Sequence, residues 1–455
     1  MIHLKRNLYF FIVLFLITII SSYLLVFVSY KAAFSLIIIF ASSLLLSYNP
    51  RLGFILIFAS ANLYNPSLRI GFINIYLSNA LILVTGVFFV FHYFLLGSKP
   101  LNHTPVELPI MLFFILAITT IRPATIDNQL KRIMAYGIFT TSYFLTVNLI
   151  RNKEHIWVLL KGIYFTTLAG SFYTIYTFMM SPFRGKTFRG YGAFINPNTL
   201  GHYMVIVLPL LAVYLIYRKK TVLYIGMIPI VLSFLSSISR TAILSLFLSV
   251  VFYNLLFKRN YWYFLGLFLF SVAILFVPAV NSRFLSVITL HDTSVLARIA
   301  IWKDAIRQFS QSPFYGVGVG NFFGSAVPYD SKIFNNAFNM FMTVLVEMGA
   351  VGILIYIYFW AEIFKYVFKM AKNSTDNLFK SLSKATFVVI ISFHLISFSE
   401  DPLIAILSNW VIGVSIGLFF SIWKQQILMN VEGKKVVSID DLEVISKDKI
   451  KSAES

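Results

Sequence analysis

Residues 187–220 read TFRGYGAFINPNTLGHYMVIVLPLLAVYLIYRKK. A polar stretch with one arginine and an Asn-Pro-Asn turn leads into an apolar run, which ends at the basic turn 218–220. The apolar run is long enough to cross about 30 Å of hydrocarbon as an α-helix. Asn198 or Thr199 would be a good N-cap, since Pro197 biases the residue before it away from helical backbone. We therefore expect a membrane helix over 199–217.

Similar apolar runs recur along almost the whole chain. Of its 455 residues 59% are hydrophobic and 12% are charged, about half the charged fraction of ordinary soluble domains. The expected spans are 8–28, 32–48, 51–64, 74–96, 107–121, 132–150, 156–180, 199–217, 221–237, 241–257, 261–279, 340–368, 383–399 and 403–422. Because the third run is short, we expect about 12–14 transmembrane helices. The sequence thus predicts an all-α, polytopic integral membrane protein.

Basic residues predict the orientation of these helices. Lys and Arg gather in short cytoplasmic loops, so the turns at 218–220 and 258–259 are expected in the cytoplasm. With 14 spans both termini are cytoplasmic too. No small-x-small cleavage site follows the first apolar run, which is therefore expected to remain as a span. The net charge of +20 has the same topological explanation, and no nucleic-acid partner is expected.

The predicted organisation has one large extracytoplasmic loop. The parts are helices over 1–279, the loop 280–339, helices over 340–422 and a polar cytoplasmic tail 423–455. Apolar residues recur with helical spacing from Val295 to Phe309, which predicts an amphipathic helix over 294–313, lying on the outer membrane surface. Pro313 would end that helix.

A glycine-rich segment, FYGVGVGNFFG, follows at 314–324. A dinucleotide-binding loop needs a strand before it and a helix after it, and neither fits here, so no nucleotide cofactor is expected. The glycines are expected to permit tight turns, or to let backbone amides approach an anion. The chain has no Cys, which excludes disulfides and thiolate chemistry.

Three arginines fall on the side of the membrane where the positive-inside rule disfavours them. They are Arg189 before the span 199–217, Arg240 at the corner 236–242, and Arg298 in the amphipathic helix. The planar arginine fork pairs bidentately with phosphate, so three converging arginines would hold a diphosphate. Alternatively, each arginine simply reaches toward lipid headgroups. The motifs around all three favour a site for an anionic ligand at the outer face.

Three blocks resemble the O-antigen ligase and polymerase family of bacterial envelope proteins. They are RGYGAFINPNTLG from Arg189, the corner SRTA with Ser239 and Arg240, and ARIAIWKDAIRQFSQSPFYGVGVGNF, continued by AFNMFMTVLVEMGAVG at 337–352. The first is similar to Arg-x-x-Gly-x-Phe-x-x-Pro-Asn, and the third to Arg-x-x-x-Trp-x-x-Ala followed by Pro-x-x-Gly-x-Gly-x-x-x-Phe. Together the blocks are more specific for the family than for one reaction.

This resemblance implies a glycosyltransferase in the cytoplasmic (inner) membrane with its active site facing outside. Such proteins move a glycan from a polyprenyl-diphosphate carrier onto an acceptor hydroxyl, and need no metal or cofactor. The implied catalytic residues are Arg189, Arg240 and Arg298, and the implied substrate-binding residues are Asn198, Trp302, Gly318 and Asn339. The implied partners are the lipid-linked glycan, its acceptor, membrane lipids, and chain-length regulator or flippase proteins.

The chain departs from the ligase pattern at Phe338. In ligases the helix after the large loop opens with His-Asn, and alignment on Glu347 and Gly349 puts Phe338 and Asn339 there. Phenylalanine cannot take a proton, so a general base would have to lie elsewhere. The candidates are Asp292, Asp304, Asp330, Glu400, Asp401, His202 and His291. Asp304 could instead pair with Lys303 or Arg307, His202 is expected to pack inside its span, and Glu347 is expected to be structural.

The missing histidine favours a polymerase, which transfers the growing glycan to the next repeat unit of O-antigen, capsule or exopolysaccharide. Two alternatives stay open. One is a ligase whose acceptor is a lipid A core or another molecule. The other is a lipid-linked-sugar flippase without chemistry, although we find no internal repeat of interrupted helices such as transporters carry. In either enzyme the arginines would neutralise charge on the leaving diphosphate.

Overall fold

The computed structural model describes residues 37–39, 41–43, 45–46, 49–63, 65–70, 73–95, 101–120, 126–180, 189–194, 196–258, 293–327, 333–404 and 409–429. The expected spans 8–28 and 261–279 lie outside these residues, as does the tail after residue 429. The candidate bases Asp292, Asp330 and His291 lie outside them too.

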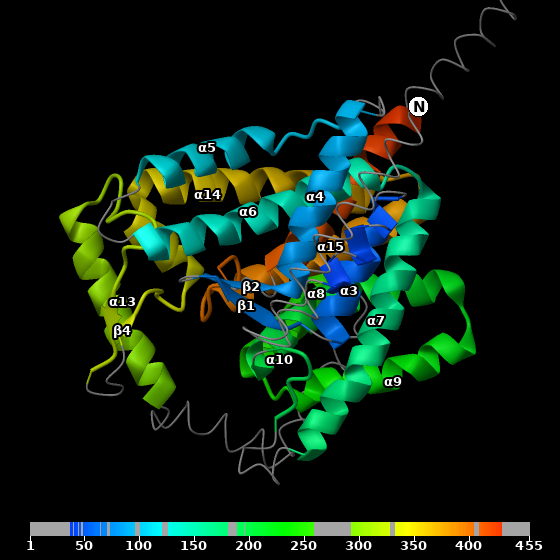
Figure 1. The fold of residues 1–455 in the computed structure, drawn as a ribbon, viewed down its shortest axis with the longest axis horizontal. Coiled ribbons are helices and arrows are strands. Elements are labelled where there is room, and N and C mark those ends of the chain that lie inside the picture. The colour runs from blue at the N-terminus through cyan, green and yellow to red at the C-terminus, as the bar shows by residue number, and fades with distance from the viewer. Residues whose placement is uncertain are drawn as a thin grey trace, which may run out of the picture.

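The described residues are mostly helical (Figure 1). The helices are α3 (Leu52–Leu63), α4 (Leu77–Leu95), α5 (Glu107–Thr119), α6 (Ile126–Leu149), α7 (Lys153–Met180), α8 (Pro197–Arg218), α9 (Thr221–Ser236), α10 (Arg240–Tyr253) with a π-helical turn (Asn254–Lys258), α13 (Thr293–Gln311), α14 (Met340–Asn373), α15 (Asn377–Ser397) and a last helix, Asn409–Met429. Two short antiparallel hairpins pair β1 (Ser67–Ile70) with β2 (Ile73–Tyr76) and β3 (Gly324–Ser325) with β4 (Ile333–Phe334).

Six helices of the described part are long and apolar enough to cross a membrane: α7, α8, α10 with its π-helical turn, α14, α15 and Asn409–Met429. Shorter apolar helices accompany them in α3, α4, α5 and α9. This confirms a polytopic, all-α membrane protein. The total of 12–14 spans includes apolar runs outside the described residues and stays a prediction.

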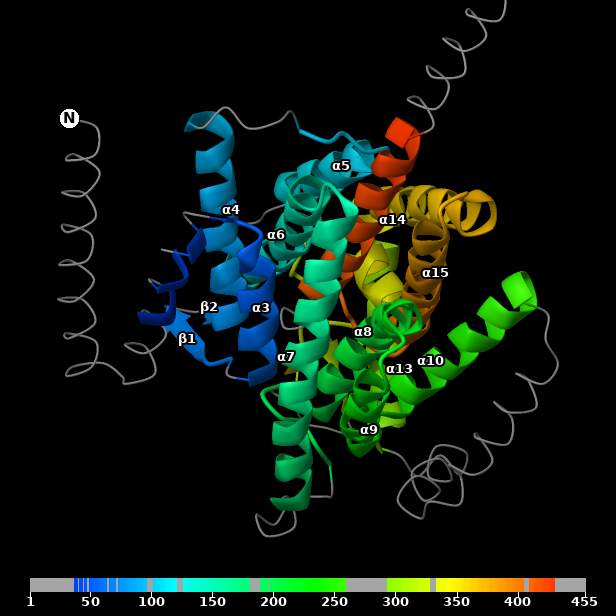
Figure 2. The ribbon, with the colours of Figure 1, turned by 90° about the vertical axis from the view of Figure 1, so that its right-hand side faces the viewer.

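Helix α8 lies at the centre of the bundle, where it packs against α7, α10 and α15 (Figure 2). Polar side chains hold it there: the Tyr203 hydroxyl accepts a hydrogen bond from Asn62 of α3 at 2.7 Å and bonds to the Thr167 hydroxyl at 2.9 Å. Small and polar residues bring membrane helices together in this way, because lipid is as apolar as the side chains and supplies no hydrophobic driving force for helix association. The start of α8 is therefore a fixed point on which a site can be built.

Helix α14 is broken at Gly349, which has φ 67° and ψ −164°. The glycine-rich segment pairs with this break, because Gly318 N donates to Glu347 O at 2.9 Å and Ala350 N donates to Pro313 O at 2.8 Å. A Cβ at Gly349 would lie 2.2 Å from Phe314 O. The glycines thus allow two backbones to touch, a role that was not expected from the sequence.

The helices begin and end on two opposite sides of the molecule. At the first, α13 lies beside the start of α14 (Figure 1), and Gln129 at the start of α6 donates to Asn321 at 2.9 Å. We call this the α13 end. At the second, Arg218 at the end of α8 lies over the Trp157 ring at 4.7 Å, near the start of α7. This second end carries the basic turn 218–220, and we call it the basic-turn end.

Candidate functional site

The segment that begins at Arg189 docks on the corner between α9 and α10. Gly190 N donates to Ser236 O at 2.9 Å, and Arg189 Nε donates to Ser237 O at 2.9 Å. A Cβ at position 190 would lie 2.3 Å from the Ser236 hydroxyl, so only glycine permits this approach. The corner therefore fixes where the Arg189 guanidinium lies.

The Asn-Pro-Asn turn caps α8 two or three residues earlier than expected. The N-cap is Asn196, whose side chain accepts from Thr199 N at 2.9 Å, and Pro197 is the first helical residue. The expectation that Asn198 or Thr199 caps the helix was wrong, because proline suits the first helical position and the residue before it becomes the cap. This leaves the Asn198 amide for other contacts.

Asn198 and Glu400 join two of the predicted arginines. Arg189 Nη2 donates to Asn198 Oδ1 at 2.8 Å, and Asn198 Nδ2 donates to Glu400 Oε1 at 3.4 Å. From the other side, Arg298 Nη2 donates to the same Glu400 oxygen at 3.0 Å. We call these four residues the Glu400 cluster. It gathers three separate parts of the chain at the α13 end.

Arg298 stands on α13, the amphipathic helix that the apolar spacing predicted. Part of the helix packs on protein: Ile301 and Ala305 are fully buried in a small core with Phe322, Ala337 and Val346. Ile299 and Ile306 of the predicted apolar face are exposed, and its contact with the outer membrane surface stays a prediction. Trp302 Nε1 also donates to Ala337 O at 2.9 Å. The helix is thus held by the protein, and this fixes Arg298 beside Glu400.

The third predicted arginine, Arg240, is the first residue of α10 and follows the corner that Arg189 contacts. Asn339 caps α14 by accepting from Met342 N at 3.1 Å, and its amide donates to Phe398 O at 3.2 Å, close to Glu400 in the chain. Gly318 lies apart from the cluster, and its backbone N–H donates to Glu347 O. Roles in substrate binding for these residues stay predictions.

Glu400 and His202 are the titratable groups beside the arginines. Burial raises the pKa of the Glu400 carboxyl, while Arg298 and the Asn198 amide hold it down. His202 lies one turn further into α8 than Asn198, is 4% exposed, and interacts electrostatically with Arg298. Its Nε2 has no hydrogen-bond partner among the described residues. His202 is packed inside its span, as expected.

A second acidic group lies deeper, behind Glu400. Asp401 Oδ2 accepts from the Thr343 hydroxyl at 3.0 Å, and burial raises the pKa of this carboxyl to about 7, against the opposing charge of Arg132. Arg132 itself pairs with Glu347 at 2.7 Å, both side chains being almost completely buried. Glu347 therefore has the structural partner that its position inside a span requires.

The remaining candidate base, Asp304, is engaged elsewhere. It pairs with Arg307 at 2.8 Å and accepts from Ser325 N at 2.8 Å. The pairing with Arg307 is one of the two that the sequence suggested. Sequence reasoning missed Arg132, although a charge at the start of an expected span was a signal. Within the described residues, no three His, Asp or Glu side chains gather as a metal ion would require.

Comparison with known proteins supports the resemblance to the O-antigen ligase family. The model of the O-antigen ligase family matches residues 225–357. The matched stretch contains Arg240, Arg298, the glycine-rich segment and the first half of α14, whereas Arg189, Asn198 and Glu400 lie outside it. A search of curated proteins found no match.

Proposed function

We propose that this chain is a glycan polymerase, because the O-antigen ligase family model matches residues 225–357 of a multi-pass membrane protein. It moves an oligosaccharide from a polyprenyl-diphosphate carrier onto the next repeat unit, at the outer face of the cytoplasmic membrane. The observation that carries this proposal is the Glu400 cluster, in which Arg189 and Arg298 meet at one end of the membrane helices.

The cluster suits a diphosphate because its donor groups already bind an anion, the Glu400 carboxylate. Its oxygen accepts from Arg298 and from Asn198, as a phosphate oxygen would. A diphosphate brings more charge and more acceptor oxygens than one carboxylate, and the arginine fork binds it bidentately. The incoming donor therefore displaces Glu400 from Arg298, and Glu400 then lies beside the bound substrate.

The transfer needs few parts. The acceptor hydroxyl oxygen attacks the anomeric carbon, and the bond from that carbon to the diphosphate oxygen breaks. The diphosphate leaves with the bonding electrons, and its charge is stabilised by Arg298 and Arg189, with Arg240 at the adjoining corner. The hydroxyl proton passes to Glu400, whose pKa is raised by burial toward the range that suits a general base.

Phe338 favours the polymerase over the ligase. Its ring lies 5.8 Å from the Arg298 guanidinium carbon and packs edge-on against Phe334. A phenyl ring at this position offers no atom that accepts a proton, whereas the ligases that this chain resembles have a histidine at the aligned position. The acceptor hydroxyl is therefore activated from the Glu400 side.

The test is the length of the glycan made by cells that lack this chain. We expect single repeat units without it and a ladder of long chains when the wild type is restored. If long chains form without it but stay on the carrier lipid, the chain is a ligase. If repeat units accumulate on the inner face, it is a flippase. Either result rejects the polymerase.

A further inference from the structure

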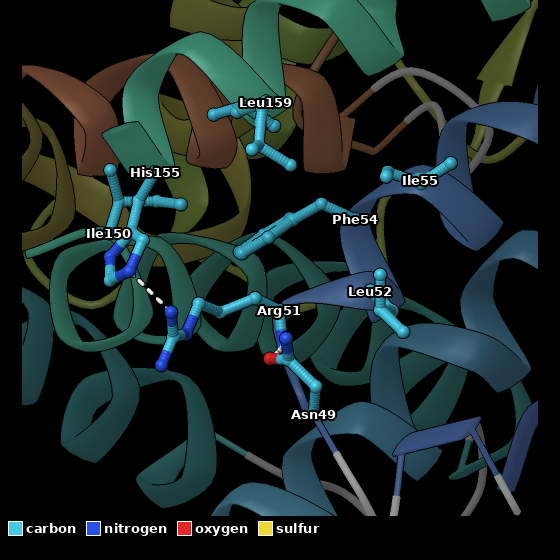
Figure 3. Close-up of a pocket in the computed structure, with 9 residues that line it drawn as sticks. Asn49, Arg51, Leu52, Phe54, Ile55, Ile150, His155 and Leu159 are labelled. Atoms are coloured by element: carbon cyan, nitrogen blue, oxygen red, sulfur yellow. Dashed lines mark hydrogen bonds between the residues drawn. The ribbon is translucent and has the colours of Figure 1, made fainter. Parts of the chain in front are cut away.

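A recess opens at the basic-turn end, and Figure 3 shows the residues that line it. It lies between the start of α3 and the start of α7 and is open to solvent. The residues that line it are Asn49, Arg51, Leu52, Phe54, Ile55, Ile150, His155, Val158 and Leu159.

The polar side of the recess is cationic. Arg51 Nη1 hydrogen-bonds to His155 Nε2, and Figure 3 shows the two side chains pointing toward each other. Arg151, next to Ile150, is not part of the lining, and its Nε donates to Asn148 O at 2.6 Å. Burial, and then the charge of Arg51, lower the pKa of Arg151, so the two positive charges interact.

Among the described residues that line the recess, none is acidic. Arg51 is exposed, and one N–H of its guanidinium donates to the His155 imidazole. Its other N–H donors are directed at no carboxylate of the described part. The positive charges of Arg51 and Arg151 repel each other, and an anion bound beside Arg51 would offset that repulsion. The ligand that fits this side carries a phosphate-like negative charge.

The other side of the recess is apolar. Phe54 and Ile55 come from α3, and Val158 and Leu159 from α7. Val158 is 48% exposed, and on a membrane helix an exposed valine faces the acyl chains of lipid. A ligand with a charged head and an apolar body would contact both sides, whereas a free anion would contact only the first.

We propose that this recess binds the phosphate group of an anionic membrane lipid, with the lipid's glycerol and first methylenes on the α3–α7 surface. Basic pockets between membrane helices bind anionic headgroups by the same chemistry. The lipid would hold the start of α3 against the start of α7. This site is independent of glycan transfer, and its failure would leave the polymerase proposal untouched.

The experiment measures thermal unfolding of the full chain in non-ionic detergent with three additives. They are short-chain phosphatidylglycerol, phosphatidylcholine with the same chains, and inorganic phosphate. The variant is Arg51→Gln, and the matched control is Lys220→Gln, which removes one exposed positive charge at the same end. We expect phosphatidylglycerol to raise the midpoint of the wild type and the control, with an affinity about tenfold weaker for Arg51→Gln.

The additives separate the two sources of phosphate. Weak effects of phosphatidylcholine and inorganic phosphate support a lipid. If inorganic phosphate binds as tightly as phosphatidylglycerol and Arg51→Gln loses both, the phosphate site stands and the lipid as its source is overturned. If Arg51→Gln and Lys220→Gln behave alike with phosphatidylglycerol, the recess is not the site and the proposal is rejected.

Discussion

Glu400 lies where distant parts of the chain meet: Arg298 is 102 residues away and Asn198 is 202 residues away. In the proposed mechanism, its carboxylate neutralises Arg298 in the absence of a donor, and it becomes available as a proton acceptor when a diphosphate takes its place. Burial raises its pKa and Arg298 opposes that rise. The proton affinity of this one side chain thus depends on whether Arg298 is engaged with substrate.

Replacing Glu400 by Gln keeps a hydrogen-bond acceptor but removes the proton acceptor. We expect Glu400→Gln to lower the transfer rate by about 100-fold. In the wild type the rate should rise with pH as Glu400 loses its proton, and this acidic limb should be absent from the pH–rate profile of the variant. The control is Glu362→Gln, which removes a carboxylate paired with Lys365. An unchanged rate and profile for Glu400→Gln would exclude it as the base.

Single residues of the site were only partly predictable. Arg189 and Arg298 stand in blocks whose spacing resembles a family pattern, so they could be named from the sequence. Glu400 was one of several acidic candidates, because nothing local tells which carboxylate meets an arginine 102 residues away. The cap at Asn196 could have been predicted from the sequence, because proline is common at the first helical position and Pro197 therefore identifies the residue before it as the cap.

The glycine-rich segment and α14 act together as one element. The segment lies against the break at Gly349, and Glu347, two residues earlier, pairs with Arg132 of α6. The sequence predicted a helix over 340–368, and the apolar run is indeed helical, but the break was not foreseen. Glycine occurs inside many membrane helices without breaking them. The break at Gly349 accompanies contact with the backbone of the glycine-rich segment, which the local sequence of α14 does not reveal.

Gly349→Ala should test this packing. Alanine disfavours the positive φ of 67°, and its Cβ would meet Phe314 O at 2.2 Å, so we expect a loss of at least about 1 kcal/mol of stability. Gly137→Ala is the control, because a Cβ at that position of α6 meets nothing within 4 Å. The measurement is the midpoint of thermal unfolding in detergent. Equal midpoints for the two variants would mean that the segment does not hold α14 at Gly349.

The whole molecule has two ends of different chemistry. The α13 end gathers the Glu400 cluster, and the basic-turn end carries the turn 218–220 and the Arg51 recess. Apolar runs were enough to predict α8, α9, and α10 with its π-helical turn within two residues at each end, because a membrane helix is determined by its own length and composition. Which helices touch was not predictable, since it depends on packing between residues far apart in sequence.

The orientation of the two ends can be tested directly, because the chain has no Cys. Single cysteines would be introduced as Ser310→Cys on the exposed part of α13 and Lys220→Cys in the basic turn. A maleimide that cannot cross membranes should label the first in intact cells and the second only after permeabilisation, because basic turns stay in the cytoplasm. The opposite labelling pattern would place the Glu400 cluster on the cytoplasmic side and contradict the account.

The most direct measurement is glycan chain length made by the purified protein in lipid bilayers from a polyprenyl-diphosphate oligosaccharide. It compares wild type, Arg298→Ala, Arg298→Lys and Arg307→Ala, the last removing an arginine of the same helix that pairs with Asp304. We predict a ladder for wild type and Arg307→Ala, a rate about 100-fold lower for Arg298→Ala, and a partial loss for Arg298→Lys. A full ladder from Arg298→Ala, at the rate of Arg307→Ala, would contradict the assignment of the Glu400 cluster as the diphosphate site.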